Sequence, residues 1–343
     1  MKTLIVLLAG LTLSLTAFAD GIEHTTTLSV EGAYYLPDHK GYGVADGGFA
    51  PISYGLVEVP GSFVPIDGDQ GRALGSWGPA EIQVLLKHTI EVPFLTGSGP
   101  LTEDNNATFD FTGALTPVSL RAELEAALTP IAFLEAYAGA MAATGWDIGI
   151  FNGMGLNADG SGVPESQSLQ GVVLKSWVGA TFQFDLAALV PGKWTHVVTL
   201  LSPRLQYAFF SGADRGQAWM FEADIGENFN GWKLLGSYFL GYQMPLALDM
   251  VGVLLQTEQN LGYVRELSPL GSGGWGSDFL LITVGPVFNF SISERNSLAV
   301  LVQFRRERRY TGDTVFYAYY ANREYAGTYW DLYRLAFSYT LKL

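Results

Sequence analysis

Apolar side chains occupy every second position in about a dozen segments of this chain. In residues 118–128, valine, leucine and alanine alternate with a second set that includes Arg121, Glu123 and Glu125. Positions 335–343 follow the same rule, with large apolar side chains at the odd positions and mainly polar or small ones between them. Successive side chains of a β-strand point to opposite faces, so this period of two predicts strands with one apolar and one polar face.

The alternation predicts an all-β chain of about twelve strands. The predicted strands are residues 23–36, 79–95, 106–116, 118–128, 131–143, 169–186, 194–211, 231–243, 246–258, 277–291, 297–311 and 328–343. Ten or fourteen strands remain open as alternatives, roughly two either way. Pro117 and Pro130 interrupt two short segments, and residues 212–230 have room for one more hairpin.

The predicted connections are of two lengths. The short turns are residues 129–130, 189–193, 243–245 and 293–296, and the long loops are 37–78, 144–168, 212–230, 259–276 and 312–327. Short and long connections alternate along the chain, except at residues 96–105, where the order calls for a short turn. An even number of antiparallel strands then places all the short turns, and both ends of the chain, on one side.

The first residues have the composition of a secretory signal. Met1 and Lys2 precede an apolar run from Leu4 to Leu15, and the small-residue site Ala17-Phe18-Ala19 follows. A basic start, an apolar stretch and an A-x-A site predict a signal peptide over residues 1–19. The exported part is then residues 20–343.

Past residue 20 no apolar stretch approaches the roughly 18 residues that a membrane helix needs. The chain is nevertheless 48% hydrophobic and 13% aromatic, with this content spread through the alternating segments. In hydrocarbon, the edges of an open sheet would leave peptide groups unpaired at several kcal/mol each, so such strands can span a membrane only when they close into a barrel.

These features resemble those of bacterial outer-membrane β-barrel proteins as a class. The resemblance covers the whole chain and rests on the signal, the alternation, the loop asymmetry and the terminal strand, which ends on Leu343 rather than the usual phenylalanine. It implies one antiparallel transmembrane barrel in the outer membrane, in contact with lipid and inserted by the barrel-assembly machinery. The competing interpretation is a soluble secreted β-sandwich, in which the apolar faces pack on one another.

The polar faces of the strands contain charges of both signs, which a barrel would enclose. The luminal candidates are Glu81, Lys87, Glu91, Arg121, Glu123, Glu125, Lys175, Asp185, Arg204, Asp249, Arg305, Glu307 and Arg334, with Asp110, Glu135, His196, Lys233 and Gln303 on the same parity. Two interpretations stay open: a salt-bridged network that serves stability, or a narrow polar pore whose charges set selectivity. The same parity places Arg306 and Arg308 on the outer face, near the extracellular rim.

The loop 37–78 is far longer than a connection needs and is rich in apolar residues, among them Phe49, Tyr54 and Phe63. Long loops inside compact proteins are usually functional, and so much apolar surface is unfavourable in water. We expect this loop to fold into the barrel mouth, with a hairpin lying over the rim as the alternative.

The residue inventory argues against several kinds of chemistry. A net charge of −14 disfavours binding to nucleic acid, and the absence of cysteine removes disulfides and thiolate sites. None of the four histidines lies one or two residues from a serine, so no paired nucleophile and base is visible and we predict no enzyme activity. Asn157 and Asp159 begin a calcium-loop pattern that ends on Ser168 instead of glutamate, and we predict neither a metal nor a cofactor.

The predicted function is passive passage of small hydrophilic solutes through a porin-like channel. The alternative is a surface interaction protein with a sealed lumen, whose loops bind a partner. A lipid-active enzyme is disfavoured by the histidine inventory. The oligomeric state stays open, because an apolar outer face suits lipid and a neighbouring barrel equally well.

Overall fold

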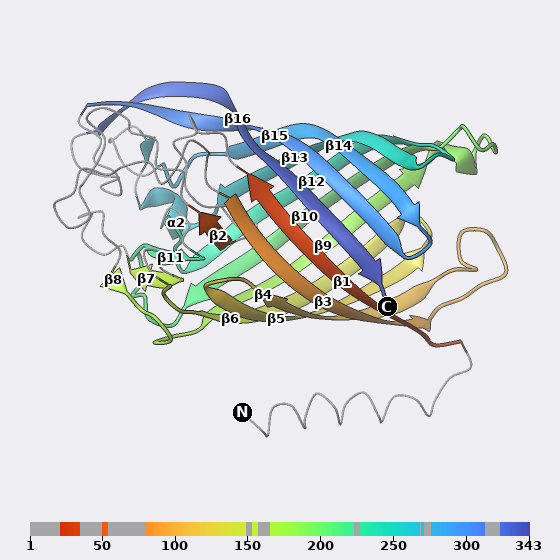
Figure 1. The fold of residues 1–343 in the computed structure, drawn as a ribbon, viewed down its shortest axis with the longest axis horizontal. Coiled ribbons are helices and arrows are strands. Elements are labelled where there is room, and N and C mark those ends of the chain that lie inside the picture. Colours follow the sequence, from red (N-terminus) through yellow and green to blue (C-terminus); the bar gives the residue numbers. More distant parts are fainter. Residues whose placement is uncertain are drawn as a thin grey trace, which may run out of the picture.

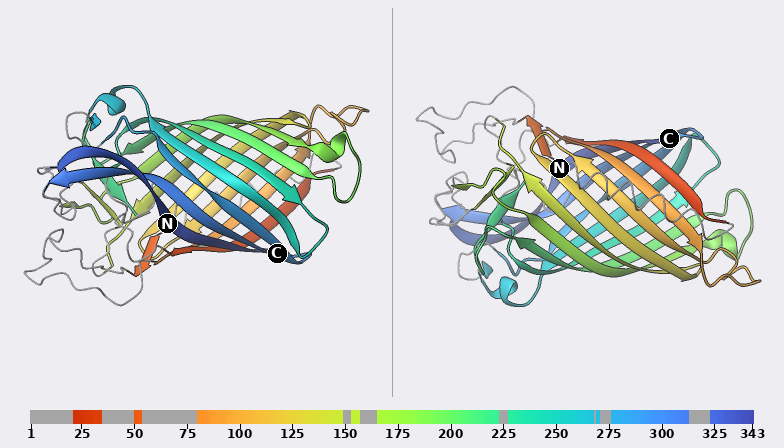
Figure 2. Two further views of the ribbon diagram at one scale, coloured as in Figure 1. Left: turned by 90° about the horizontal axis from the view of Figure 1, so that it is seen from above. Right: turned by 90° about the horizontal axis from the view of Figure 1, so that it is seen from below.

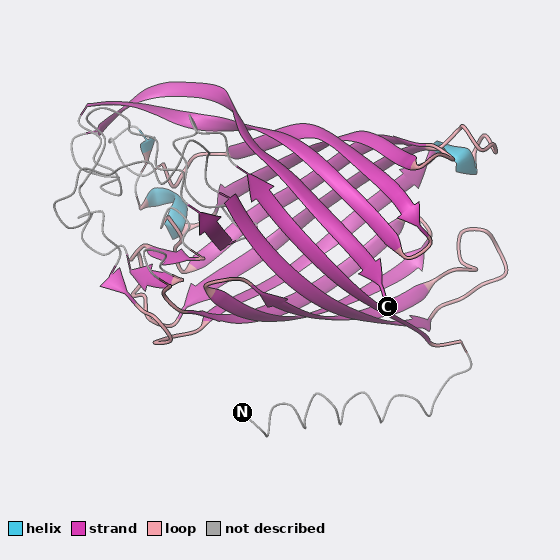
Figure 3. Cartoon of the chain, in the orientation of Figure 1, coloured by secondary structure: helices cyan, strands magenta, loops and turns pink. Residues whose placement is uncertain are grey.

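The computed structural model describes residues 21–34, 50–53, 80–148, 153–156, 165–222, 227–267, 269–270, 276–312 and 323–343. Long strands dominate this part of the chain, with short helical turns only near the ends of the molecule (Figures 1 and 3). The predicted signal over residues 1–19 lies outside the described residues, as does most of the loop 37–78. Among the residues described, no helix is long and apolar enough to cross a membrane.

The twelve long strands form one closed antiparallel barrel, as the alternation predicts. They are β1 (Glu23–Tyr34), β3 (Ala80–Pro93), β4 (Asn106–Leu115), β5 (Ser119–Ile131), β6 (Leu134–Gly145), β9 (Val173–Asp185), β10 (Val197–Phe210), β12 (Gly231–Gln243), β13 (Leu248–Asn260), β14 (Leu281–Ser293), β15 (Asn296–Gly312) and β16 (Arg323–Lys342). Each pairs with its neighbour in this order, and β1 closes the ring by pairing with both β3 and β16. The ring has no unpaired edge along its length, and Figure 2 shows its strands running obliquely around the axis.

The two faces of the barrel wall are inverted relative to a soluble protein. Leu120, Val178 and Leu240 point outward and are 52%, 55% and 58% exposed. Gln206 and Gln303 point inward, and each is only 2% exposed. The apolar faces therefore do not pack on one another, and the alternative of a β-sandwich is wrong.

Aromatic rings lie over glycines on neighbouring strands and fix the register of the wall. Tyr137 on β6 is paired with Gly179 on β9, and Gly139 is paired with Trp177 two residues away. A Cβ built on either glycine would overlap the aromatic ring of its partner. Each ring thus fills the space that the missing side chain leaves, an arrangement that pins strand register.

We predict that Gly179→Ala lowers the free energy of unfolding by about 1–3 kcal/mol, because the new methyl group displaces the Tyr137 ring. The Tyr137 hydroxyl would also leave Ser202, from which it is 3.0 Å away. Guanidinium unfolding followed by tryptophan fluorescence measures the effect. Gly113→Ala is the matched control, because a Cβ there has no neighbour within 4 Å. Equal effects of the two substitutions would contradict this account of the register.

The connections make the two ends of the barrel unequal. At one end, here the short-turn end, lie residues 94–105, 132–133, 186–196, 244–247 and 294–295. At the other, the long-loop end, lie 35–79, 146–172, 211–230, 261–280 and 313–322, together with one short turn at 116–118. The exceptional connection at 94–105 is held by Asn105, whose amide donates to the carbonyls of Leu95 and Pro130 at 3.0 and 2.6 Å.

Two details differ from the sequence predictions. The turn expected at residues 129–130 lies at 132–133, because Pro130 is accommodated at a register shift inside β5, between Leu128 and Ile131. Four short strands also lie outside the ring: β2 (Ala50–Ser53), β7 (Met154–Leu156), β8 (Glu165–Ser166) and β11 (Trp219–Phe221). The strand β2 pairs with residues 80–82 of β3, at the long-loop end.

Candidate functional site

The candidate site is the lumen and the mouth at its long-loop end. On the wall formed by β1, β3 and β5, polar side chains join across the strands. Arg121 donates to Gln83 at 2.5 Å, and Gln83 donates to Glu31 at 2.6 Å. The neighbouring Glu81 is 4% exposed, so this part of the wall is buried although it is polar.

The adjoining wall, on β15 and β16, contains a basic cluster built by a bulge. Gln303 pairs with Arg334 but Phe304 pairs with Leu332, so Tyr333 is the extra residue of a β-bulge, and its side chain is fully buried. The guanidinium carbon of Arg305 lies 3.3 Å from the centre of the Tyr333 ring, and that of Arg334 lies 5.3 Å from it. Arg334 also donates to Gln303 at 2.6 Å. The bulge therefore holds two positive charges inside the barrel.

Acidic side chains gather in the middle of the lumen, on β4, β5 and β6. Asp110 and Glu125 are direct cross-strand partners on the inner face. Lys87 forms an ion pair with Asp110 at 2.9 Å, and Trp177 donates to Glu125 at 2.6 Å. The Lys87 side chain is 46% exposed, whereas that of Arg121, nearer the mouth, is 9% exposed. Solvent therefore reaches this middle region, while the polar wall beside the mouth is covered.

The remaining candidates have local partners. Glu91 accepts from Asn106 at 2.7 Å, Asp185 bonds His196 at 2.6 Å, and Asp249 accepts from Asn289 and Ser291. Glu123 lies 3.8 Å from Arg121, the guanidinium of Arg204 lies over the Trp177 ring, and Glu307 interacts electrostatically with Arg305. Lys175 is half-buried on the inner face of β9. The structure thus joins the candidates in several small networks and does not gather them at one point.

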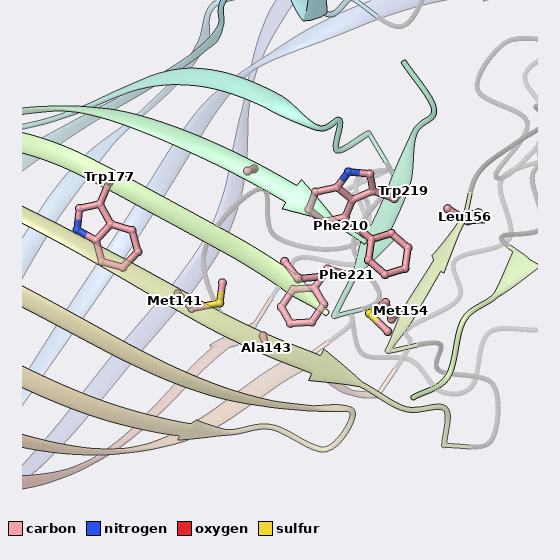
Figure 4. Packing of buried hydrophobic residues seen from close by; sticks show 10 residues of the cluster. Met141, Ala143, Met154, Leu156, Trp177, Phe210, Trp219 and Phe221 are labelled. Carbon is pink, nitrogen blue, oxygen red and sulfur yellow. The ribbon is translucent and has the colours of Figure 1, made fainter. Parts of the chain in front are cut away.

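The mouth is filled on one side by an apolar cluster, which we call the mouth cluster. Its residues come from the inner faces of β6, β9 and β10 and from the long loops that follow β6 and β10: Met141, Ala143, Met154, Leu156, Val173, Trp177, Ala208, Phe210, Trp219 and Phe221. Figure 4 shows the rings of Trp219 and Phe221 reaching from the loops toward Phe210 and Met141 of the wall. The apolar loop residues therefore pack on the barrel and are not left in water.

The loops of the mouth cluster are joined by a small sheet. The strand β11 pairs with β7, and β7 pairs with β8. Trp219 also forms an isolated bridge with Asn228, so these two residues lie side by side. The sequence left room for one more hairpin in residues 212–230, and the described residues of this segment add no strand to the ring.

A fully buried carboxylate follows β11. Glu222 accepts a hydrogen bond from Ser119 at 2.5 Å, and its second oxygen lies 3.7 Å from Arg121. Burial raises the pKa of the Glu222 carboxyl above its ordinary value, and the positive charge of Arg121 opposes that shift. The backbone of Glu222 has φ of 58°, in the left-handed region that non-glycine residues enter at a cost of roughly 1 kcal/mol or more.

The loop 211–230 makes two further contacts, one charged and one apolar. Glu227 forms an ion pair with Arg308 of β15 at 2.5 Å. We expected Arg308 on the outer face, but it lies beyond the last β14 partner of β15, Thr283 with Arg305, where its side chain can turn over the rim. Ala218 and Phe229 pack on Val264 of α2 (Tyr263–Glu266), which belongs to the next long loop.

The sequence predicted a set of luminal charges but did not point to the residues that close the mouth. Trp219, Phe221, Glu222 and Glu227 all lie in a segment read as a connection. A usable signal was present, because Ala218-Trp219-Met220-Phe221 is an apolar run inside a long loop. The expectation that the loop 37–78 enters the mouth lies outside the described residues.

Comparison with known proteins adds no assignment, because no family model and no curated protein matches this chain. Among the residues that the structure describes, no group of three histidine, aspartate or glutamate side chains is placed to hold a metal ion.

Proposed function

We propose that this chain is an outer-membrane channel through which small hydrophilic solutes diffuse. The observation that carries the proposal is a closed ring of twelve strands with apolar side chains outside and charged side chains inside. An exposed apolar band of this kind is unfavourable in water and suits the hydrocarbon of a bilayer. The predicted signal peptide supports export.

The exposed tryptophans lie near the two ends of the barrel, as expected for a barrel that spans a bilayer. Trp194 lies beside the short-turn end and is 53% exposed, and Trp232 and Trp330 are outward-facing toward the long-loop end. Tryptophan is enriched where hydrocarbon meets the headgroups, because its ring is apolar and its N–H donates. In this proposal the long loops are extracellular and the short turns periplasmic, insertion is by the barrel-assembly machinery, and no catalytic step or cofactor is involved.

Conductance in a planar bilayer tests the proposal. The protein should require detergent for extraction from membranes. After purification and insertion into the bilayer, it should produce discrete current steps in salt solution. A sealed barrel that serves as a surface interaction protein is the second candidate, favoured by the closed mouth cluster. It would insert in the bilayer without conductance, and liposomes containing it would not swell in sugar solutions.

We predict that the channel prefers cations. Among the described residues, the inner-face carboxylates in the middle of the lumen and toward the short turns are Glu23, Glu91, Asp110, Glu123, Glu125, Glu135, Asp185 and Asp249, whereas the basic side chains there are Lys87, Arg204 and Lys342. A salt gradient should therefore give a reversal potential of the sign for cation flow.

Replacing Glu123, Glu125 and Glu135 together with glutamine should reduce the cation-to-anion permeability ratio by roughly half or more. The matched control replaces Glu103 and Glu294 with glutamine and Asp104 with asparagine, because all three are exposed in the connections at the short-turn end. An unchanged ratio in the luminal variant, or anion preference in the natural protein, would contradict the predicted selectivity.

A further inference from the structure

The connection 211–230 is longer than its end points require, and its described residues 211–222 are here called the mouth strap. It leaves β10 at Phe210 and enters β12 at Gly231, and these two strands are direct neighbours in the ring. Adjacent antiparallel strands need a connection of roughly two to five residues. The Asn230 side chain already closes the base, because it accepts from the Phe210 N–H at 2.7 Å and donates to the Ala213 carbonyl at 2.9 Å. The rest of the strap is free to reach elsewhere.

The described residues of the connection 211–230 contact two walls of the mouth that are almost opposite. Glu222 contacts Ser119 and Arg121 on β5, and Glu227 contacts Arg308 on β15. Around the ring of twelve, β5 and β15 are seven strands apart through β10 and five apart through β1, where six would be diametrically opposite. The described parts of the connection are therefore held at two sides of the mouth, the strap at β5 through Glu222 and the return segment at β15 through Glu227.

The contact at β5 differs in kind from the rest of the strap. Trp219 and Phe221 are held by apolar packing, which does not respond to pH or salt. Glu222 instead brings a carboxylate into a fully buried position, where a charge is costly unless it is paired. Its charged neighbours are Arg121 and Glu123 from β5 and Lys175 from β9, while its backbone N–H donates to the Gly153 carbonyl at 2.7 Å.

We propose that the mouth strap is a gate, closed in this structure, and that the contact of Glu222 with Ser119 and Arg121 is its releasable fastening. Release would remove the strap from above the charged lumen, and docking would cover it again. The left-handed backbone of Glu222 favours release, because the strain disappears once the residue leaves its position. This inference rests on the proposed function, since a gate has a purpose only if solutes pass.

The direct test is Glu222→Lys, which places a positive charge against Arg121 and Lys175. We expect mean single-channel conductance to rise about twofold or more over the natural protein. Glu103→Lys, an exposed site in the turn 94–105, is the charge-matched control and should conduct like the natural protein. Heat-dependent mobility on gels establishes that each variant is a folded barrel.

A second variant tests the gate without introducing repulsion. The chain has no cysteine, so Ser119→Cys with Glu222→Cys creates a single pair of thiols at the fastening. Oxidation or a short bis-methanethiosulfonate linker should hold conductance at the low level, and reduction should raise it. Loss of free thiols reports whether the link has formed, and failure to link would contradict the contact itself.

The failures of the two proposals differ. If the natural protein, Glu222→Lys and the reduced cysteine variant all conduct alike, the gate is wrong while the channel stands. If all three insert as folded barrels and none conducts, the proposed channel function is wrong, and the proposal of a gate is wrong as well.

Discussion

Val178→Arg is expected to destabilise the barrel in a lipid bilayer by about 2–4 kcal/mol, the range measured for arginine on the lipid face near the midplane. Val178 lies near the middle of β9 (Val173–Asp185), faces outward and is 55% exposed. If the exposed band lies in hydrocarbon, the guanidinium must be desolvated or must draw water and headgroups inward. Guanidinium titration of the protein in phospholipid vesicles measures the change in unfolding free energy.

Leu189→Arg is the matched control for this experiment. Leu189 is 72% exposed, but it lies in the connection 186–196 beyond the end of β9. The same change of side chain should there cost less than about 1 kcal/mol, because arginine remains in water or among headgroups. If the two arginines have equal effects, the outer face of the ring does not lie in a membrane, and the proposed location is wrong.

The ring was predictable because every strand follows the same alternation of inward and outward side chains. In β9, every inward side chain from Val173 to Asp185 meets the lumen or the mouth cluster, and every outward one meets the outer face. The period of two therefore shows directly in the sequence, and it predicted all twelve strands, although both faces of residues 131–143 are mostly apolar and the alternation there does not separate inner from outer positions. The limits of strands were less accurate, as at Pro130, because a bulge lets a strand continue past a residue that usually ends it.

The mouth was not predictable in the same way. Its contacts join residues far apart in sequence, such as Ser119 with Glu222 and Glu227 with Arg308. No local period marks such pairs, since their proximity depends on how the loops cross the completed ring. Composition indicated the loop 37–78, most of which lies outside the described residues, and it did not indicate the loops 146–172 and 211–230, whose described residues contribute to the mouth cluster.

For the luminal candidates on β15 and β16, the face was predictable from the sequence but the local packing was not. Parity placed Arg305 and Arg334 inside, but it did not foresee that a bulge would bring Tyr333 in with them. A bulge changes the parity of a strand at one residue, and it is chosen by packing of the neighbours, not by alternation. The basic cluster on that wall is therefore a tertiary feature, although its arginines were identified from the sequence.

Channel conductance should increase as pH rises above the ordinary range of a glutamate, if the mouth strap is a gate. In the docked strap, burial raises the pKa of Glu222, whereas in a released strap the carboxyl is in water and titrates at its ordinary value. The docked form thus binds the proton more tightly. Docking is strongest below the ordinary pKa and weakens as pH rises from there through the raised pKa. Within that window the ratio of released to docked strap changes by up to about tenfold per pH unit.

Glu222→Gln separates this proton from every other titrating group. Glutamine has the shape of the protonated acid, accepts from Ser119 as before, and leaves Arg121 with Gln83 and Glu123 as partners. The variant should therefore remain docked and show low conductance at every pH, while Glu103→Gln retains the pH response. Single-channel recordings across the pH range distinguish the two. A pH response of normal size in Glu222→Gln, or conductance that falls as pH rises, would show that the buried carboxyl does not control the mouth.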